Sequence, residues 1–200
     1  MRSWSCILLM ILASGASARE VIVGSKVFTE SVILAELATQ LLDAKGIDAV
    51  HRRELGGTSV LWSGLLRGDI DCYPEYTGTL RGEVFAGEGV QSDEQLRDTL
   101  AQAGVWASGS LGFDNTYVLG MRKDVAKRLS IARTSDLAKH PELRFGFSNE
   151  FMRRADGWPG LKRAYGMPQT DVRGMQHDLA YRALASGAID VTDLYATDAE

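Results

Sequence analysis

The sequence has little cysteine and few long apolar runs. Of its two cysteines, Cys6 lies in an N-terminal stretch that has the pattern of a signal peptide: Arg2 supplies a positive charge, residues 6–13 are apolar, and residues 16–18 match a cleavage site. We therefore expect residues 1–18 to be removed on export to the periplasm. Cys72 then has no partner for an intrachain disulfide, and a lone cysteine in a strand is usually a small buried hydrophobe.

Membrane-spanning segments and an excess of positive charge are also lacking. No segment after residue 18 is long and apolar enough to cross a bilayer. Without Arg2, 21 of the 22 basic residues remain against 26 acidic ones, a net charge of −5. A nucleic-acid partner would require a basic face. We expect no such partner, and contact with a membrane only through another protein.

Metal-binding and catalytic motifs are absent as well. The histidines match no metal-ligand spacing, so we expect each to lie on the surface or to be satisfied by hydrogen bonds: His51, His140 and His177. There is no Gly-x-Ser-x-Gly elbow, no phosphate loop and no dinucleotide fingerprint. We expect no cofactor, and a binding module rather than an enzyme. A secreted hydrolase that uses Glu75 or Glu150 is the alternative.

The sequence does contain short apolar strands that alternate with helices. Thr29 is predicted to cap a helix that ends at Gly46. This helix carries an apolar stripe of helical period, formed by Ile33, Leu34, Leu37, Ala38, Leu41 and Leu42. Strands are expected at 21–23, at 49–53 and just before Pro74, with a second helix from residue 58 that is closed by Gly68. This order predicts a parallel sheet covered by helices.

Beyond residue 80 the alternation continues. We expect a loop over residues 80–92, followed by a helix over 93–103 that is capped by Ser92. Further strands are predicted at 105–107, 116–121, 143–147, 172–175 and 188–191. Further helices are predicted from residue 134, over 160–165 and over 178–186.

A short pattern recurs in the second half. Gly68-Asp69-Ile70-Asp71 returns as Gly187-Ala188-Ile189-Asp190, and a tyrosine stands eight residues after each first glycine, at Tyr76 and at Tyr195. We infer two similar α/β lobes, residues 19–118 and 119–200. The carboxyl ends of strands and the space between lobes are both preferred ligand sites, so the two lobes are expected to share a cleft.

The chemistry predicted for this cleft has two parts. Three tyrosines near loop starts offer aromatic faces to a cation that cannot donate hydrogen bonds: Tyr76, Tyr117 and Tyr195. Three further residues offer donors to a carboxylate: Lys26, Thr79 and Arg154. From spacing alone, the alternative stays open that the tyrosines are half-buried packing residues and that the two basic side chains lie on solvated faces.

Five segments carry a resemblance: 24–30 (GSKVFTE), 56–58 (GGT), 73–79 (YPEYTGT), 149–160 (NEF to RADGWPG) and 194–198 (LYATD). In this order they resemble the substrate-binding proteins of osmoprotectant ABC transporters, which take glycine betaine, choline, carnitine or proline betaine. The resemblance implies a two-lobed periplasmic-binding-protein fold of type II that closes on its ligand by a hinge motion and delivers it to the permease.

The resemblance also implies a role for single residues. Tyr76, Tyr117 and Tyr195 would form a box around a quaternary ammonium, with Asn115 beside it. Lys26, Thr79 and Arg154 would hold a carboxylate. Members of this family continue for several tens of residues past the Tyr-x-Thr-Asp motif and return to the first lobe. We expect this return segment to be missing from lobe 2 at Glu200, so that the box lacks one wall.

Overall fold

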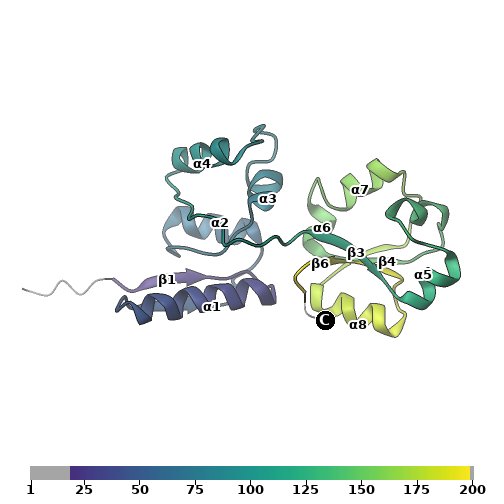
Figure 1. Ribbon diagram of the computed structural model, residues 1–200, viewed down its shortest axis with the longest axis horizontal. Coiled ribbons are helices and arrows are strands. Elements are labelled where there is room, and N and C mark those ends of the chain that lie inside the picture. Colours follow the sequence, from purple (N-terminus) through teal and green to yellow (C-terminus); the bar gives the residue numbers. More distant parts are fainter. Residues whose placement is uncertain (1–18, 199–200) are drawn as a thin grey trace, which may run out of the picture.

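The computed structural model describes residues 19–198, and the predicted signal peptide lies outside the described residues. Two α/β lobes lie side by side, joined by the extended segment that leads into β3 (Figure 1). The first lobe holds a two-stranded sheet and the second a four-stranded one. No helix within residues 19–198 has both the length and the apolar character needed to cross a membrane.

The sheet of lobe 1 is parallel, as predicted. β1 (Val21–Gly24) pairs with β2 (Ala49–Arg52); α1 (Thr29–Ala44) connects them, and α2 (Thr58–Arg67) follows. In place of the third strand expected before Pro74, Cys72 forms a single bridge to Val23. Because β2 occupies the other side of β1, Cys72 lies at the edge of the sheet. Its side chain is exposed there, and our expectation of a buried cysteine is wrong.

α1 buries a face that adjoins its apolar stripe, so that Leu34, Ala38 and Leu42 of the stripe are half-buried. Its fully buried residues are small, namely Ser31, Ala35 and Thr39. Ile33, Leu37 and Leu41 are instead 53%, 57% and 65% exposed. The helix begins at Thr29 with Phe28 as its N-cap, one residue earlier than expected, and Gly46 follows its end with the predicted left-handed φ of 75°. Small side chains let α1 lie close against β1 and β2, and this outweighs the apolar character of the other face.

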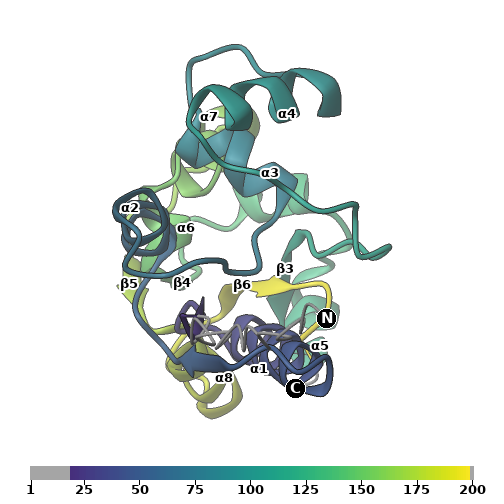
Figure 2. The same cartoon turned by 90° about the vertical axis from the view of Figure 1, so that its left-hand side faces the viewer.

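The stretch that we predicted as a loop, residues 80–92, is partly helical. α3 (Thr77–Thr79) runs directly into η1, a π-helical turn over Leu80–Val84. Leu80, Phe85 and Val90 are buried here against two leucines of α4 (Asp93–Gln102), which explains why the stretch is ordered. Ser92 caps α4 in a full capping box, as predicted. The strand expected at 105–107 does not form. α4 and α1 lie on opposite sides of lobe 1 (Figure 2).

The sheet of lobe 2 has the strand order β3-β6-β4-β5. Its strands are β3 (Tyr117–Met121), β4 (Phe145–Ser148), β5 (Val172–Met175) and β6 (Val191–Tyr195). β3 runs antiparallel to β6, whereas β4 runs parallel to both β5 and β6. We assigned residues 117 and 118 to lobe 1, but they pair here with the strands of lobe 2.

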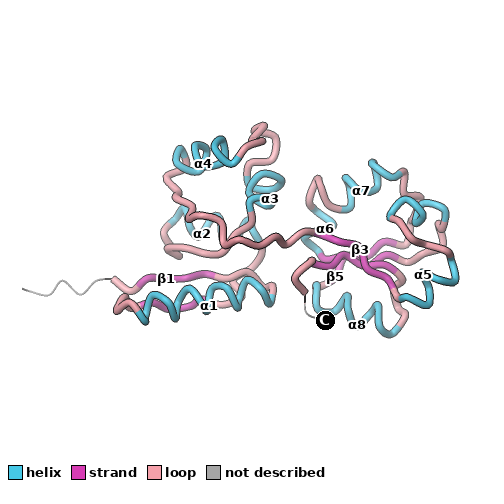
Figure 3. Tube along the Cα trace, in the orientation of Figure 1, coloured by secondary structure: helices cyan, strands magenta, loops and turns pink. Residues whose placement is uncertain are grey.

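Helices cover both faces of this sheet. α8 (His177–Ser186) lies on one side, and α6 (Asn149–Arg153) and α7 (Trp158–Tyr165) lie on the other (Figure 3). α5 (Lys123–Leu129) and η2 (Thr134–Lys139), a 3-10 helix, connect β3 to β4. We did not predict α5 or α6, and β6 begins three residues later than the strand expected at 188–191. The core between these elements is aromatic and contains Phe145, Phe147, Phe151 and Trp158.

The recurring sequence pattern corresponds to the same connection built twice. Gly68 and Gly187 each follow a helix in the left-handed conformation, both with a φ of 74°. The carboxylates of Asp71 and Asp190 then each accept a backbone N–H from a neighbouring segment, at 2.8 and 3.0 Å. In both lobes this turn leads the chain from a helix back into the sheet.

Candidate binding cleft

A cleft of about 1480 Å³ is lined by residues of both lobes. β4 and β6 end at this side of lobe 2 and β3 begins there, so Tyr195 and Tyr117 lie at the end of the sheet that is nearer to lobe 1. All seven predicted site residues line the cleft: Lys26, Tyr76, Thr79, Asn115, Tyr117, Arg154 and Tyr195. Strand ends that are far apart in the sequence therefore meet here. The ligand-binding role of these residues remains a prediction.

Tyr117 and Tyr195 form an aromatic pair at this end of the lobe 2 sheet. They are directly opposite each other in the β3–β6 register, with ring centroids 5.1 Å apart and hydroxyl oxygens 3.4 Å apart. Phe28 of lobe 1 packs edge-on against Tyr195 at 5.5 Å. Burial is the main cause of the raised pKa of both phenols, and the negative charge of Glu150 raises both further. The pair is thus a desolvated aromatic surface within reach of a carboxylate.

Tyr76 lies apart from this pair. Among residues 19–198, Asn115 is the side chain that its hydroxyl contacts, with Nδ2 at 3.4 Å from the phenol oxygen, and no ring contact joins Tyr76 to Tyr117 or Tyr195. The same Nδ2 donates to Oε1 of Glu30 at 2.8 Å. Asn115 therefore ties the first turn of α1 to the segment that crosses between the lobes.

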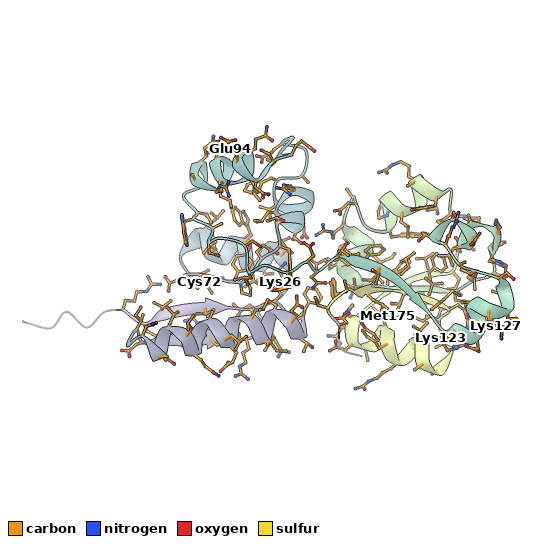
Figure 4. All side chains as sticks on the ribbon, in the orientation of Figure 1. Lys26, Cys72, Glu94, Lys123, Lys127 and Met175 are labelled. Atoms are coloured by element: carbon orange, nitrogen blue, oxygen red, sulfur yellow. The ribbon has the colours of Figure 1, made fainter. Side chains whose placement is uncertain are left out.

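Lys26 follows β1 and is almost completely buried at the side of lobe 1 that faces lobe 2 (Figure 4). Its Nζ donates to Oε1 of Glu75 at 2.7 Å and to Oγ1 of Thr58 at 2.9 Å. Burial raises the pKa of the Glu75 carboxyl by more than Lys26 lowers it, and Glu150 raises it further. Lys26 is thus not on a solvated face, and two of its three N–H groups are already engaged.

Arg154 is the corresponding cation of lobe 2. Its guanidinium binds Asp156 in bidentate fashion at 2.9 and 2.8 Å, and Nη1 reaches Thr79 and Glu83 of lobe 1, both at 3.3 Å. Its central carbon lies 5.6 Å from the ring centroid of Tyr117. The structure thus brings Arg154, Thr79 and Tyr117 together, but it also supplies the arginine with two carboxylates.

Sequence reasoning missed several residues that contact the charged groups of the cleft. Thr58 donates to Oε1 of Glu150 across the two lobes at 2.9 Å. Glu83 went unnoticed because we assigned its segment to a loop. It approaches Arg154 beside Gly82, where an added Cβ would lie 2.5 Å from an oxygen of Asp156. Thr58 and Asp156 lie within segments 56–58 and 149–160, which carry the family resemblance, and these segments could have identified both residues.

His177 was also missed as a cleft residue. Its ring stacks on Tyr195 at 4.5 Å, and its Nε2 lies 2.9 Å from Asp198, so it is a hydrogen-bonded histidine as expected. His51 is likewise bonded to Glu36 and Ser25. Within the part of the chain that the structure describes, no group of histidine, cysteine and acidic side chains is arranged to hold a metal ion.

Solved structures with the same architecture define the class of protein. The structure of a glycine betaine/carnitine/choline ABC transporter protein superposes with a TM-score of 0.63 at 28% identity, covering 90% of this chain and 70% of that one. Apo YehZ from Escherichia coli superposes with a TM-score of 0.55 at 26% identity, over 90% and 71% of the two chains. The fold is that of a type II periplasmic binding protein, with two α/β lobes around a cleft.

Sequence comparison identifies the family. Residues 19–200 match the substrate binding domain of the ABC-type glycine betaine transport system, and the chain belongs to this family. It is 31% identical to the ergothioneine transport permease/ergothioneine binding protein EgtU of Helicobacter pylori, over 96% of this chain and 36% of that protein. It is 29% identical to the glycine betaine-binding protein YehZ of E. coli, over 83% and 59%. It is 31% identical to the carnitine transport binding protein OpuCC of Listeria monocytogenes, over 92% and 63%. The chain thus spans less than two thirds of the length of these relatives.

Proposed function

We propose that this chain is the extracytoplasmic solute-binding component of an ABC importer. It binds a quaternary-ammonium osmoprotectant, such as glycine betaine, choline or carnitine, in the cleft between the lobes. It then delivers the ligand to the transmembrane subunits of a permease from the periplasm. Family membership and the ligands named for the relatives support this proposal.

The observation that carries the proposal is the half-buried pair of Tyr117 and Tyr195. A quaternary ammonium has no N–H to donate, so the negative face of an aromatic ring is a suitable partner for it. The guanidinium of Arg154 already lies 5.6 Å from the ring centroid of Tyr117, so this face accommodates a cation. Tyr76, across the cleft, supplies the third ring of the box, with Asn115 beside it.

The polar side of the cleft would hold the other end of the ligand. Lys26, Thr79 and Arg154 all line the cleft and present donors from the two lobes. Their direct contacts across the lobe boundary, such as that of Arg154 with Thr79, would form as the lobes close on a ligand. Closure around a small molecule is how two-lobed binding proteins couple recognition to docking on a partner.

A thermal-shift screen followed by calorimetric titration tests the proposal. The screen should contain glycine betaine, choline, carnitine and ergothioneine, since these are the ligands that the relatives are named for. A ligand at 100 times its Kd stabilises the folded state by about 2.7 kcal/mol. Failure of every quaternary amine to bind would overturn the proposal.

The hydrolase alternative has its own test. Glu75 would need a free carboxylate, but its Oε1 is engaged by Lys26 and by the backbone N–H of Tyr76. We expect no turnover of ester or glycoside substrates. Turnover that is abolished by Glu75→Gln would favour the hydrolase instead.

A further inference from the structure

We infer that the polar side of the cleft accepts hydrogen bonds from its ligand. The preferred ligand is then a quaternary ammonium cation that carries a hydroxyl, of the choline type, and not a zwitterion of the glycine betaine type. This inference rests on the proposed function and specifies its ligand. It also revises our expectation that Lys26, Thr79 and Arg154 hold a carboxylate.

The two cations of the cleft are already neutralised by the protein. Arg154 uses four of its five N–H groups on Asp156, Glu83 and Thr79. Lys26 uses two of its three on Glu75 and Thr58. The side chains of both are 5% exposed. Little donor capacity is therefore left for the two oxygens of an incoming carboxylate.

Negative charge exceeds positive charge around these residues. Three carboxylates contact Lys26 or Arg154, and a fourth, Glu150, binds the Thr58 hydroxyl that Lys26 also binds. The six groups have a net charge of −2 if all are ionised, the carboxylates being Glu75, Glu83, Glu150 and Asp156. Burial, and then the charge of Glu150, raise the pKa of both Glu75 and Glu83. A ligand carboxylate would add a fifth negative group to this crowded set, whereas a ligand cation would offset it.

The buried polar atoms without a partner also favour a ligand that donates a hydrogen bond. Three buried atoms of cleft residues that lack a hydrogen-bond partner among residues 19–198 can act as acceptors: Oε2 of Glu150, Oδ1 of Asn115 and Nδ1 of His177. Oε2 of Glu75 and the hydroxyl of Tyr73 are buried as well, but the hydroxyl interacts with the Glu75 carboxyl and lowers its pKa. Nε of Arg81 is a buried donor without a partner, but its guanidinium is paired with Asp93 in lobe 1. Buried polar atoms normally find partners, and acceptors require a donor.

Glu150 is well placed to receive that donor. It lies close enough to Tyr117 and Tyr195 for its charge to raise the pKa of both phenols. Its Oε1 is held by Thr58, and its Oε2 is buried and free. A cation against the exposed side of this tyrosine pair, with a hydroxyl on a short arm, would thus have both ends satisfied.

Calorimetric titration of the chain with three ligands tests the inference without any substitution. Choline is a cation with a donor, its methyl ether is a cation without one, and glycine betaine is a zwitterion. We expect choline to bind at least about tenfold more tightly than either of the others, as befits a hydrogen bond to a buried charged group.

Two variants test which residues cause the preference for choline. Glu83→Gln frees Nη1 of Arg154, so the ratio of choline affinity to glycine betaine affinity should fall by about tenfold. Glu150→Gln should weaken both cations because it removes a negative charge beside the tyrosine pair, and it should weaken choline by more than its methyl ether, since only choline donates a hydrogen bond. Glu94→Gln is the matched control, because Glu94 is exposed in the first turn of α4, away from the cleft (Figure 4).

The outcomes separate failure of the choline preference from failure of the proposed function. If glycine betaine binds as tightly as choline, or if choline and its methyl ether bind equally, the inference is wrong and the proposed function stands. If no quaternary amine binds, the proposed function fails, and this inference fails with it. If the ratio of choline affinity to glycine betaine affinity stays the same in Glu83→Gln and in Glu150→Gln, the inference is also wrong.

Discussion

Oγ1 of Thr58 donates a hydrogen bond to Oε1 of Glu150 at 2.9 Å, joining the start of α2 in lobe 1 to the start of α6 in lobe 2. The same hydroxyl accepts a hydrogen bond from Nζ of Lys26 at 2.9 Å. One buried oxygen thus connects a cation of one lobe with a carboxylate of the other. Polar links of this kind, together with the packing of Phe28 on Tyr195, join the lobes, whereas each apolar core cluster lies within one lobe.

Thr58→Val should loosen the arrangement of the lobes. Valine has the shape of threonine but no hydroxyl, so Glu150 would lose the partner of Oε1 while its Oε2 already lacks one. We expect a loss of ligand affinity of roughly 1–3 kcal/mol, the usual cost of an unsatisfied buried group. Small-angle scattering should show a more open chain. Thr58→Ser keeps the hydroxyl and should retain both properties; equal effects of the two changes would contradict the role of the bond.

Tyr76 offers a clean test of the aromatic box. It belongs to neither core cluster, unlike Tyr117, which packs against the core of lobe 2. Tyr76→Ala should therefore weaken binding of a quaternary amine by roughly 2 kcal/mol without unfolding the protein. Tyr76→Phe keeps the ring face and should cost far less in a calorimetric titration. Equal losses would mean that the hydroxyl, through Asn115, is the important group.

Glu36 provides a pH-dependent contribution to stability away from the cleft. Hydrogen bonds from His51, Gln40 and Arg53 lower its pKa from an ordinary 4.5 to about 2. Because the folded-state pKa is the lower one, the ionised form is stabilised by folding. This contribution is complete above pH 4.5 and is lost as the pH falls towards about 2.

An NMR titration of the Glu36 carboxyl checks this expectation directly, and its midpoint should lie near 2. In acid unfolding, Glu36→Gln should remove part of the pH dependence in that window. The exposed residue Glu94, changed in the same way, should leave it unaltered. A midpoint near 4.5 would mean that the hydrogen bonds do not persist in solution.

The core of lobe 2 depends on Phe147. This side chain is 0% exposed and packs against Phe145, Phe151 and Trp158 with ring centroids 5.1–5.5 Å away. Phe147→Ala should lower the free energy of unfolding by roughly 3–5 kcal/mol because it leaves a cavity among rigid rings. Phe113→Ala removes the same atoms from a side chain that is 43% exposed and should cost far less. Urea unfolding measures both.

The sequence predicted the parts of this site that lie at strand ends. Lys26, Tyr117, Arg154 and Tyr195 follow or begin recognisable strands or motifs, and topology brings such ends together. Sequence patterns did not predict features that depend on tertiary packing. The apolar stripe of α1 has the right period, but period does not specify which face meets the sheet. Glu83 could not be found, because it reaches Arg154 only through a π-helical turn that no propensity indicates.

The buried pair of Lys26 and Glu75 should be coupled in stability. Their side chains are 5% and 8% exposed, so Lys26→Met would leave a buried carboxylate without its cation. Breaking a buried ion pair in this way typically costs roughly 3–5 kcal/mol. Lys26→Met combined with Glu75→Gln removes the uncompensated charge, and we expect it to recover most of the lost free energy of unfolding.

The pH dependence of the Lys26→Met variant identifies the cause. The pKa of Glu75 is already raised by burial, and removal of the lysine, which lowers it, raises it further. A carboxyl whose folded-state pKa exceeds its unfolded value favours folding when protonated, so the variant should lose stability as the pH rises from 4.5, the ordinary pKa of this group, to neutral. The double variant should not show this slope. If urea unfolding gives both variants the same midpoint at both pH values, Glu75 is not the group that Lys26 neutralises. The charge of Lys26 would then act on Glu150 through the hydroxyl of Thr58.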